Sequence, residues 1–432
     1  MAESDLTDHL ITLAHLPAAD LPASALRLAR LSLLDWMACG LAGVAEPLAV
    51  KLRTLAEAEG GAQDASIFGA GHAPARMAAL VNGATSHALD YDDTHFAHVG
   101  HLSVAIYPSA LAIGEEIDAS ADDVIAAFLV GAEGAIRVGL VLGQAHYDLG
   151  FHQTATAGAF GATLASARLL GLDACQTRHA LGLCATRASG VKAQFGTMGK
   201  PYNAGVAAAN GVECAKLASL GMTSADDGLL GPQGFVATHA PRVDALETGA
   251  RFLFEDNKFK LHACCHGTHA MIEALLSADA SGLDDVATLE VRTNPRWLNV
   301  CDLKAPRTGL ESKFSYAWLA GMALRGDATE DEALYSDALA SDAALIAFAQ
   351  KVTVCGDATL SDMQVVCTLT LANGRAVEVT YDLAAPIPYE RLAEKLRVKA
   401  DELIADKARA VWAFNDPSRK TARQIGDVIR AD

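Results

Sequence analysis

One short segment concentrates the side chains best suited to proton transfer. It contains four histidines and three aspartates within fifteen residues: His87, Asp90, Asp92, Asp93, His95, His98 and His101. An imidazole titrates near neutral pH, and a neighbouring carboxylate fixes its tautomer and raises its pKa. The segment is therefore typical of an acid–base and substrate-binding site. The same side chains can ligate a metal, so a metal-dependent hydrolase is the rival interpretation, although the sequence contains no HExxH motif.

Two further segments add candidate acid–base groups. The sequence HYDLGFHQT brings the phenol of Tyr147 close to the imidazole of His152. In FGTMGKP, Lys200 follows a glycine-rich turn and precedes Pro201. Proline suits the first position of a helix, because its missing N–H needs no partner there. We therefore expect the Lys200 ammonium near a helix N-terminus, where the helix dipole helps it to hold a carboxylate.

A fourth candidate segment, KLHACCHGTH, carries Cys265 and His266. Adjacent cysteines rarely ligate one ion with good geometry, so we expect no metal there. The chain has nine cysteines, an odd number, and no CxxC motif. That pattern disfavours a disulfide framework or a zinc ribbon and favours a reducing compartment.

Helices must position the first three of these segments. Up to about residue 255 the sequence is rich in Ala and Gly and poor in β-branched runs. Residues 22–40 have apolar side chains at helical spacing, and Gly40 stands where a helix C-cap belongs. Residues 155–170 and 205–220 are rich in small side chains, which let helices approach closely. We therefore expect a tight, all-helical core.

The most apolar long stretch, residues 124–144, is expected to be a core helix. Ser120 followed by Asp123 is typical of the N-terminal cap of such a helix. Glu133 and Arg137 lie in its middle, which disfavours a membrane span.

The character of the sequence changes near residue 258. Strand-like patterns occur at 287–301, 351–354, 363–371 and 376–383, and the last two flank an Asn-Gly pair that favours a hairpin. After Pro388 the pattern is helical again. The predicted fold is mainly α: a large helical domain of residues 1–258 and 392–432, with a smaller α+β domain of residues 259–391.

Composition excludes several classes of function. The chain has 432 residues, 51% hydrophobic and 20% charged, as expected of a globular protein. Its net charge of −18 disfavours nucleic acid or a membrane surface as partner, because both require a basic face. The acidic N-terminus has no apolar run typical of a signal peptide. We expect a cytoplasmic protein.

Taken in order, these segments resemble the MmgE/PrpD family, which includes 2-methylcitrate dehydratase, cis-aconitate decarboxylase and iminodisuccinate epimerase. The similarity runs through NGATSHALDYDDTHFAHVGHLS, HYDLGFHQTATAGAFGA, FGTMGKPYNAGVAAANG, KLHACCHGTHAMIEAL and ESKFSYAWLAGMAL. The resemblance implies an all-α domain with a small α+β lid domain, a homodimer, and chemistry without a metal or organic cofactor.

The resemblance also assigns residues. Asp90 and Thr94 match the Asp and Thr of the family's D-x-D-D-T motif, and His101 matches the histidine that follows it. His152 matches the histidine of a second motif, in which Gln153 here replaces a proline.

Two further matches lie later in the chain. Lys200 matches the family's active-site lysine, and Tyr316 matches a tyrosine of the lid-domain helix. Cys265 stands where decarboxylase members carry a histidine. This departure disfavours decarboxylation, although His266 or His269 could substitute.

The implied reaction is removal of a proton next to a carboxylate in a small di- or tricarboxylate, by a hydro-lyase or an epimerase. The alternatives are a cis-aconitate-type decarboxylase and the metal-dependent hydrolase. In an epimerase, Tyr147 and Lys200 would flank the reacting carbon. The candidate catalytic residues are His101, Tyr147, His152 and Lys200, and the candidate substrate-binding residues are Asp90, Thr94, Cys265, His266 and Tyr316.

Overall fold

The computed structural model describes residues 6–242 and 251–430. The chain divides into two compact units: unit 1 comprises Met1–Phe259 and Ile404–Asp432, and unit 2 comprises Lys260–Leu403. The second division falls at 404, where the sequence suggested 392. The reason is that helix α16 (Tyr389–Ile404) is continuous and its Lys395 bonds to Glu273 of unit 2 at 2.6 Å.

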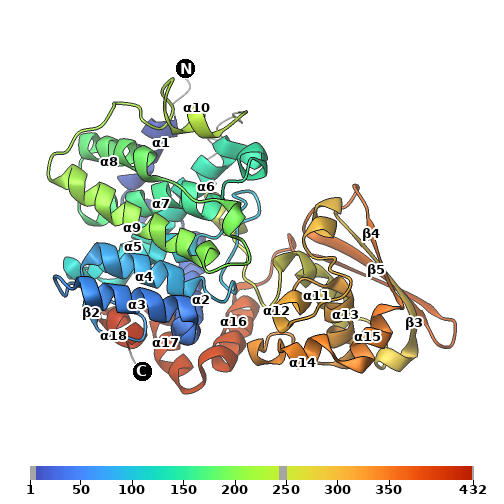
Figure 1. Cartoon of the computed structure of the whole chain (residues 1–432). Helices are drawn as coiled ribbons and strands as arrows, with labels where there is room; N and C mark the ends of the chain where they lie inside the picture. The colour runs from blue at the N-terminus through green and yellow to red at the C-terminus, as the bar shows by residue number, and fades with distance from the viewer. Residues whose placement is uncertain (1–5, 243–250, 431–432) are drawn as a thin grey trace. The chain divides into compact units, whose positions relative to one another are not determined.

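Unit 1 is mainly helical, as Figure 1 shows. Its helices are α1 (Leu6–Ala14), α2 (Ala23–Ala42), α3 (Pro47–Glu59), α4 (Ala75–Ser86), α5 (Ser103–Glu116), α6 (Ala121–Asp148), α7 (Gln153–Leu169), α8 (Ala174–Arg187), α9 (Gly199–Ser219), α10 (Phe235–His239), α17 (Ala408–Trp412) and α18 (Ala422–Arg430). Two short strands, β1 (Ala65–Ser66) and β2 (His72–Ala73), pair antiparallel.

Small residues let the central helices of unit 1 approach closely. Helix α4 packs on α5 and α9, and α7 packs on α5, α6 and α9. A Cβ on Gly205 of α9 would lie 2.2 Å from the carbonyl oxygen of Leu80 in α4. A Cβ on Gly161 of α7 would lie 2.5 Å from the carbonyl oxygen of Gly131 in α6. The predicted tight core is confirmed, and it brings the ends of α4, α7 and α9 together.

Helix α6 is the predicted core helix. The Ser120 hydroxyl caps it by accepting the N–H of Asp123 at 3.0 Å. In its middle, Arg137 lies 2.7 Å from Glu133, so the two buried charges neutralise each other. By length and composition the segments Ala23–Ala45 and Ala121–Asp148 could each cross a membrane, but 72% and 94% of their apolar windows are buried inside the protein.

The expected C-cap at Gly40 is wrong. Helix α2 continues to Ala42 and is capped by Gly43. A Cβ on Gly40 would stand 2.1 Å from the Phe68 ring. Glycine is therefore needed here for a close approach of that ring and does not end the helix.

Unit 2 contains a four-stranded sheet with the order β4-β3-β5-β6. Its strands are β3 (Val286–Thr293), β4 (Val352–Gly356), β5 (Gln364–Leu371) and β6 (Ala376–Asp382), and its other helices are α11 (His269–Leu276), α12 (Gly309–Ser312), α13 (Tyr316–Arg325), α14 (Asp337–Ala340) and α15 (Ala343–Ala349). Strand β3 is parallel to β4 and antiparallel to β5.

The sheet contains the predicted hairpin, and one of its strands is shorter than the sequence pattern indicates. Strands β5 and β6 pair antiparallel across the Asn-Gly turn, where Gly374 has a φ of +85°. Strand β3 ends at Thr293, although the pattern continues to 301, because Pro295 begins a short 3-10 helix and cannot donate to the ladder. Helix α11 packs on β5, β6 and α13.

Candidate active site

The loop between α4 and α5, residues 87–102, carries the candidate acid–base groups. Asp90 has a φ of +53°, a left-handed conformation that aspartate tolerates better than most residues. Asp93 is buried and accepts hydrogen bonds from the N–H of Ser103 at 3.1 Å and from Asn257 at 2.8 Å. Asp93 therefore fixes the end of the loop to the start of α5.

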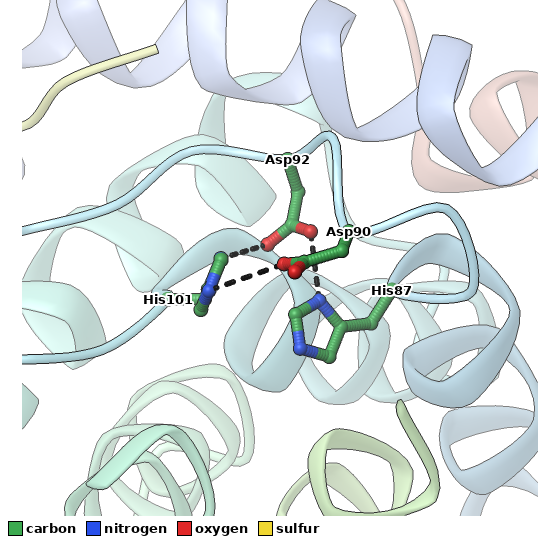
Figure 2. A group of neighbouring side chains, drawn as sticks. All are labelled: His87, Asp90, Asp92 and His101. Carbon is green, nitrogen blue, oxygen red and sulfur yellow. Dashed lines mark hydrogen bonds and ion pairs between the residues drawn. The ribbon is translucent and has the colours of Figure 1, made fainter. Parts of the chain in front are cut away.

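Asp92 holds two imidazoles at once, as Figure 2 shows. Its Oδ1 lies 2.7 Å from Nδ1 of His87, and its Oδ2 lies 2.7 Å from Nδ1 of His101. Nδ1 of His87 donates to Asp92, and because an ionised carboxylate repels a lone pair, the 2.7 Å approach of Oδ2 favours the hydrogen on Nδ1 of His101 as well. Nε2 of His101 keeps its lone pair, 3.5 Å from Oδ1 of Asp90. A carboxylate behind an imidazole is the arrangement that orients a general base.

Charge and burial set the protonation of this pair. Burial alone would raise the pKa of the Asp92 carboxyl, but the two imidazoles hold that pKa well below its usual range. Burial lowers the pKa of His101 to about 4, against the opposing effect of Asp92. At neutral pH Asp92 is therefore ionised and His101 is neutral. A neutral, oriented imidazole can accept a proton from a substrate.

Lys200 reaches the same group from α9. Its Nζ lies 2.6 Å from Oδ2 of Asp90, so Lys200 and His101 flank one carboxylate. Helix α9 begins at Gly199, not at Pro201, and Lys200 lies in its first turn. The predicted position near a helix N-terminus is confirmed, and this end of the helix carries partial positive charge.

His152 joins the group from the start of α7. Its Nδ1 accepts a hydrogen bond from the side-chain amide of Asn203 at 3.3 Å, which leaves the hydrogen on Nε2. Its ring centroid lies 5.0 Å from that of Phe195 and 6.3 Å from that of His87. Burial, followed by the charge of Lys200, lowers the pKa of His152 well below its usual range. His152 is therefore a neutral N–H donor.

Among the described residues, the side chains of His87, Asp90, Asp92 and His101 could supply ligands to a metal, since one ligand atom of each lies within 4.8 Å of the others. The donor set does not suit a cation. Both oxygens of Asp92 already lie 2.7 Å from an imidazole nitrogen. The ammonium of Lys200, 2.6 Å from Asp90, opposes a second positive charge. The geometry favours the acid–base interpretation.

The remaining polar residues of the loop brace it. His95 donates through Nε2 to the carbonyl of Leu253 at 2.9 Å and accepts the N–H of His98 at 3.1 Å. The backbones of Thr94 and Lys258 exchange hydrogen bonds of 2.7 and 2.8 Å. A substrate contact by Thr94 stays a prediction.

Tyr147 lies near the end of α6, in a pair with Lys192. The ammonium of Lys192 lies 3.6 Å from the centroid of the Tyr147 ring and donates to the Tyr147 backbone carbonyl at 3.1 Å. The helix is kinked before this point, at Gly143, which has a φ of +66°. A proton-transfer role for Tyr147 stays a prediction.

Cys265, His266 and Tyr316 belong to unit 2. Tyr316 is fully buried at the start of α13, and its hydroxyl donates to the carbonyl of Gly267 at 2.8 Å. Burial raises the pKa of Tyr316 well above its usual range. Tyr316 thereby holds the turn that carries Cys265 and His266. Contact of these three side chains with substrate stays a prediction.

Sequence reasoning gave no specific role to three supporting residues. His87 and Asp92 lie in the histidine-rich segment, but the shared contact through Asp92 is visible only in three dimensions. Asn203 stands three positions after Lys200 on the same helix, and that spacing puts both on one face. Helical spacing could have indicated Asn203.

Comparison with known proteins gives the family. Residues 12–245 match the MmgE/PrpD N-terminal domain, and residues 262–415 match the MmgE/PrpD C-terminal domain. The chain is 32% identical over 285 residues to a cis-aconitate decarboxylase-like protein of Aspergillus oryzae, covering 60% of this chain and 58% of that protein. It is 31% identical over 215 residues to the cis-aconitate decarboxylase of Homo sapiens, covering 47% and 44%.

A third relative is the cis-aconitate decarboxylase of Aspergillus terreus, 29% identical over 295 residues, covering 63% of this chain and 60% of the relative. The matched regions thus span between 44% and 60% of these relatives' own lengths. The two domain matches are more extensive, run in order and together reach from residue 12 to residue 415. On this evidence the chain belongs to the MmgE/PrpD family.

Proposed function

We propose that this protein is a cofactor-independent lyase that acts at a carbon next to a carboxylate in a small di- or tricarboxylate. The supporting observation is the neutral His101 imidazole, held by Asp92, whose Nε2 faces the Asp90–Lys200 ion pair. A base beside a cation suits removal of a weakly acidic proton, because the cation stabilises the negative charge that develops on the substrate carboxylate.

Lys200 supplies the charge that binds the substrate. A carboxylate that approaches the first turn of α9 meets the Lys200 ammonium and the partial positive charge of the helix end. Asp90 holds Lys200 in place before the substrate arrives. The Nε2–H of His152 offers a second hydrogen-bond donor.

His101 then removes the proton from the substrate carbon through Nε2, and the C–H electron pair passes toward the adjacent carboxylate. Asp92 stabilises the imidazolium that forms. In a dehydration, the departing hydroxyl takes up the proton that His101 removed, while the Nε2–H of His152 donates a hydrogen bond to the leaving oxygen, and the products are an alkene and water. In an epimerisation, a second group returns a proton to the opposite face, and Tyr147 is the candidate.

Decarboxylation of a cis-aconitate-like substrate is the second candidate. It is favoured by the names of the relatives, which are cis-aconitate decarboxylases 29% and 31% identical to this chain. Here a C–CO₂ bond breaks, and an acid delivers a proton to the carbon that remains. Cys265, where a histidine is expected of decarboxylase members, argues against this reaction.

The test is incubation of the full chain in D₂O with citrate-like, aconitate-like and aspartate-derived carboxylates, followed by NMR and mass spectrometry. An alkene supports dehydration, and release of CO₂ supports decarboxylation. Deuterium in recovered substrate without net loss supports epimerisation. Absence of product, CO₂ and exchange with every carboxylate would contradict the proposal.

We also infer a homodimer and a cytoplasmic location. The family resemblance supports the dimer, and an odd number of scattered cysteines supports a reducing compartment. Light scattering on the purified protein measures the oligomeric state, and a monomer at working concentration would contradict the dimer.

A further inference from the structure

Two cysteine sulfurs lie in contact in unit 2. The Sγ of Cys301 lies 3.1 Å from the Sγ of Cys265. Cys301 is fully buried and Cys265 is partly exposed. The sulfurs of a disulfide are about 2.05 Å apart, so an approach of roughly 1 Å brings this pair to bonding distance.

The backbones on both sides of the sulfur pair are tied together. Tyr316 donates its backbone N–H to the carbonyl of Cys301 at 3.0 Å and its hydroxyl to the carbonyl of Gly267 at 2.8 Å. Gly267, two residues after Cys265, packs against Trp297, where a Cβ would stand 2.5 Å from a ring atom. The carbonyl of Trp297 accepts the N–H of Cys301 at 2.8 Å. These contacts keep the two thiols facing each other.

We propose that Cys265 and Cys301 are a redox modification site and form a reversible disulfide when the oxidant is a peroxide. The Cys265 thiolate attacks the O–O bond of hydrogen peroxide and becomes a sulfenic acid, and hydroxide leaves and takes up the released proton as water. The Cys301 thiol attacks the sulfenic sulfur, and a second water leaves. Two thiols and one peroxide thus give one disulfide and two waters. A dithiol reverses the reaction by exchange.

The exposure and acidity of the two thiols decide which of them reacts with peroxide first. Burial raises the pKa of the Cys301 thiol well above its usual range, so Cys301 stays protonated and shielded from peroxide. Cys265 is the partly exposed residue of the pair. In a reducing compartment, such a bridge is transient and acts as a redox sensor.

The effect on turnover rests on the proposed function and on the sequence-based prediction that Cys265 and His266 contact its substrate. The bridge removes the Cys265 thiol and fixes the turn that carries His266. Turnover should therefore fall on oxidation and recover with dithiothreitol.

The experiment treats the reduced, folded full chain with hydrogen peroxide, blocks the remaining thiols and digests without reductant. We expect a peptide that joins Cys265 to Cys301 and disappears with dithiothreitol. In Cys301→Ser and in Cys301→Ala, oxidation should stop at a sulfenic acid on Cys265, which dimedone traps. The matched control Cys367→Ser removes another buried thiol of unit 2 and should leave the bridge unchanged.

Folded, oxidised protein without the joined peptide overturns the proposal, as does a bridge between Cys264 and Cys265 in its place. Peptide mass needs no substrate, so this result is independent of the proposed function. A Cys265–Cys301 bridge that leaves turnover unchanged supports the modification site and removes Cys265 from the substrate contacts.

Discussion

At the scale of single residues, Asp92 decides what His101 can do. Its Oδ1 accepts from His87, and its Oδ2 lies 2.7 Å from Nδ1 of His101, a distance that favours the hydrogen on that nitrogen. Nε2 of His101 then faces Asp90, which is shared with Lys200. Asp92 therefore orients the base, His101, and Asp90 holds the cation, Lys200, beside it.

Asp92→Asn should lower kcat by at least about 10²-fold, the contribution of one positioned acid–base group. The amide can donate to Nδ1 of His101 and so favours the wrong tautomer. The charge of Asp92 raises the pKa of His101, so the acid limb of the kcat/KM profile should move to lower pH. Steady-state kinetics across pH measures both effects.

The matched control is Asp93→Asn. Asp93 is equally buried but bonds to Ser103 and Asn257. This variant should lower the melting temperature and leave kcat of the folded protein near wild type. Equal kcat in Asp92→Asn and wild type would contradict the role of Asp92.

Turnover should be insensitive to chelators, because the donor groups that a metal would need are engaged with each other and with Lys200. Assays after dialysis against EDTA check this. Lost turnover that one divalent ion restores would favour the metal-dependent hydrolase and assign His87, Asp90, Asp92 and His101 as ligands.

Residue type and clustering indicated Asp90, His101, His152 and Lys200, and these four lie together in unit 1. The pairings were not predictable. Neighbouring polar side chains have many possible partners, and only the packing of α4, α7 and α9 selects among them.

At the scale of elements, local chemistry predicted the long helices α2, α6, α7 and α9 and the four strands of the unit 2 sheet, and it failed where packing used the same residue differently. The Asn-Gly turn gave the β5–β6 hairpin, since its backbone requirement is local. Gly40 did not end α2, because its role is to admit Phe68. Pro201 did not begin α9, because proline fits the whole first turn of a helix and not only its first position.

Gly205→Ala should destabilise the protein by about 1–3 kcal/mol, the usual cost of overpacking. The new methyl group would lie 2.2 Å from the carbonyl oxygen of Leu80, and a backbone atom cannot move aside as the end of a flexible side chain can. Because α4 and α9 carry the two halves of the site, Lys200 should also shift relative to Asp90. Thermal unfolding and kcat measure the two effects.

Gly71→Ala is the control, since a Cβ there meets nothing within 4 Å. It should leave both quantities unchanged. A Gly205→Ala protein as stable as wild type would show that α4 and α9 can separate without cost.

At the scale of the whole molecule, the acid–base group lies in unit 1, and the candidates Cys265, His266 and Tyr316 lie in unit 2. Composition indicated the change of character near residue 258. The return to unit 1 at 404 was not predictable, because a helical pattern does not tell which unit a helix such as α16 packs against.

The free energy of unfolding should decrease as pH falls from about 6.5, the unperturbed pKa of histidine, toward about 4, the lowered pKa of the buried His95. Burial lowers the pKa of His95 to about 4 and of His98 to about 3. Over this range these two histidines bind protons in the unfolded chain and not in the folded chain, so their contribution favours unfolding in acid; Glu115, whose pKa burial raises to about 7, acts in the opposite direction. His95 alone contributes about 3 kcal/mol by this linkage.

Chemical denaturation at a series of pH values measures how the free energy of unfolding changes with pH. Burial is the largest cause of the lowered pKa of His98, so His98→Leu should weaken the pH dependence of stability. An unchanged pH dependence of the free energy of unfolding in His98→Leu would contradict the assignment of this effect to His98.

The most direct test of the central claim is kcat of Lys200→Met on the substrate that the D₂O screen identifies. Methionine keeps the length of the stem and deletes the charge, so kcat should fall by at least about 10²-fold with little change in melting temperature. Lys216→Met, on the same helix and paired with Glu116 at 2.6 Å, should keep its kcat. Near-wild-type kcat in Lys200→Met would contradict the account of the active site.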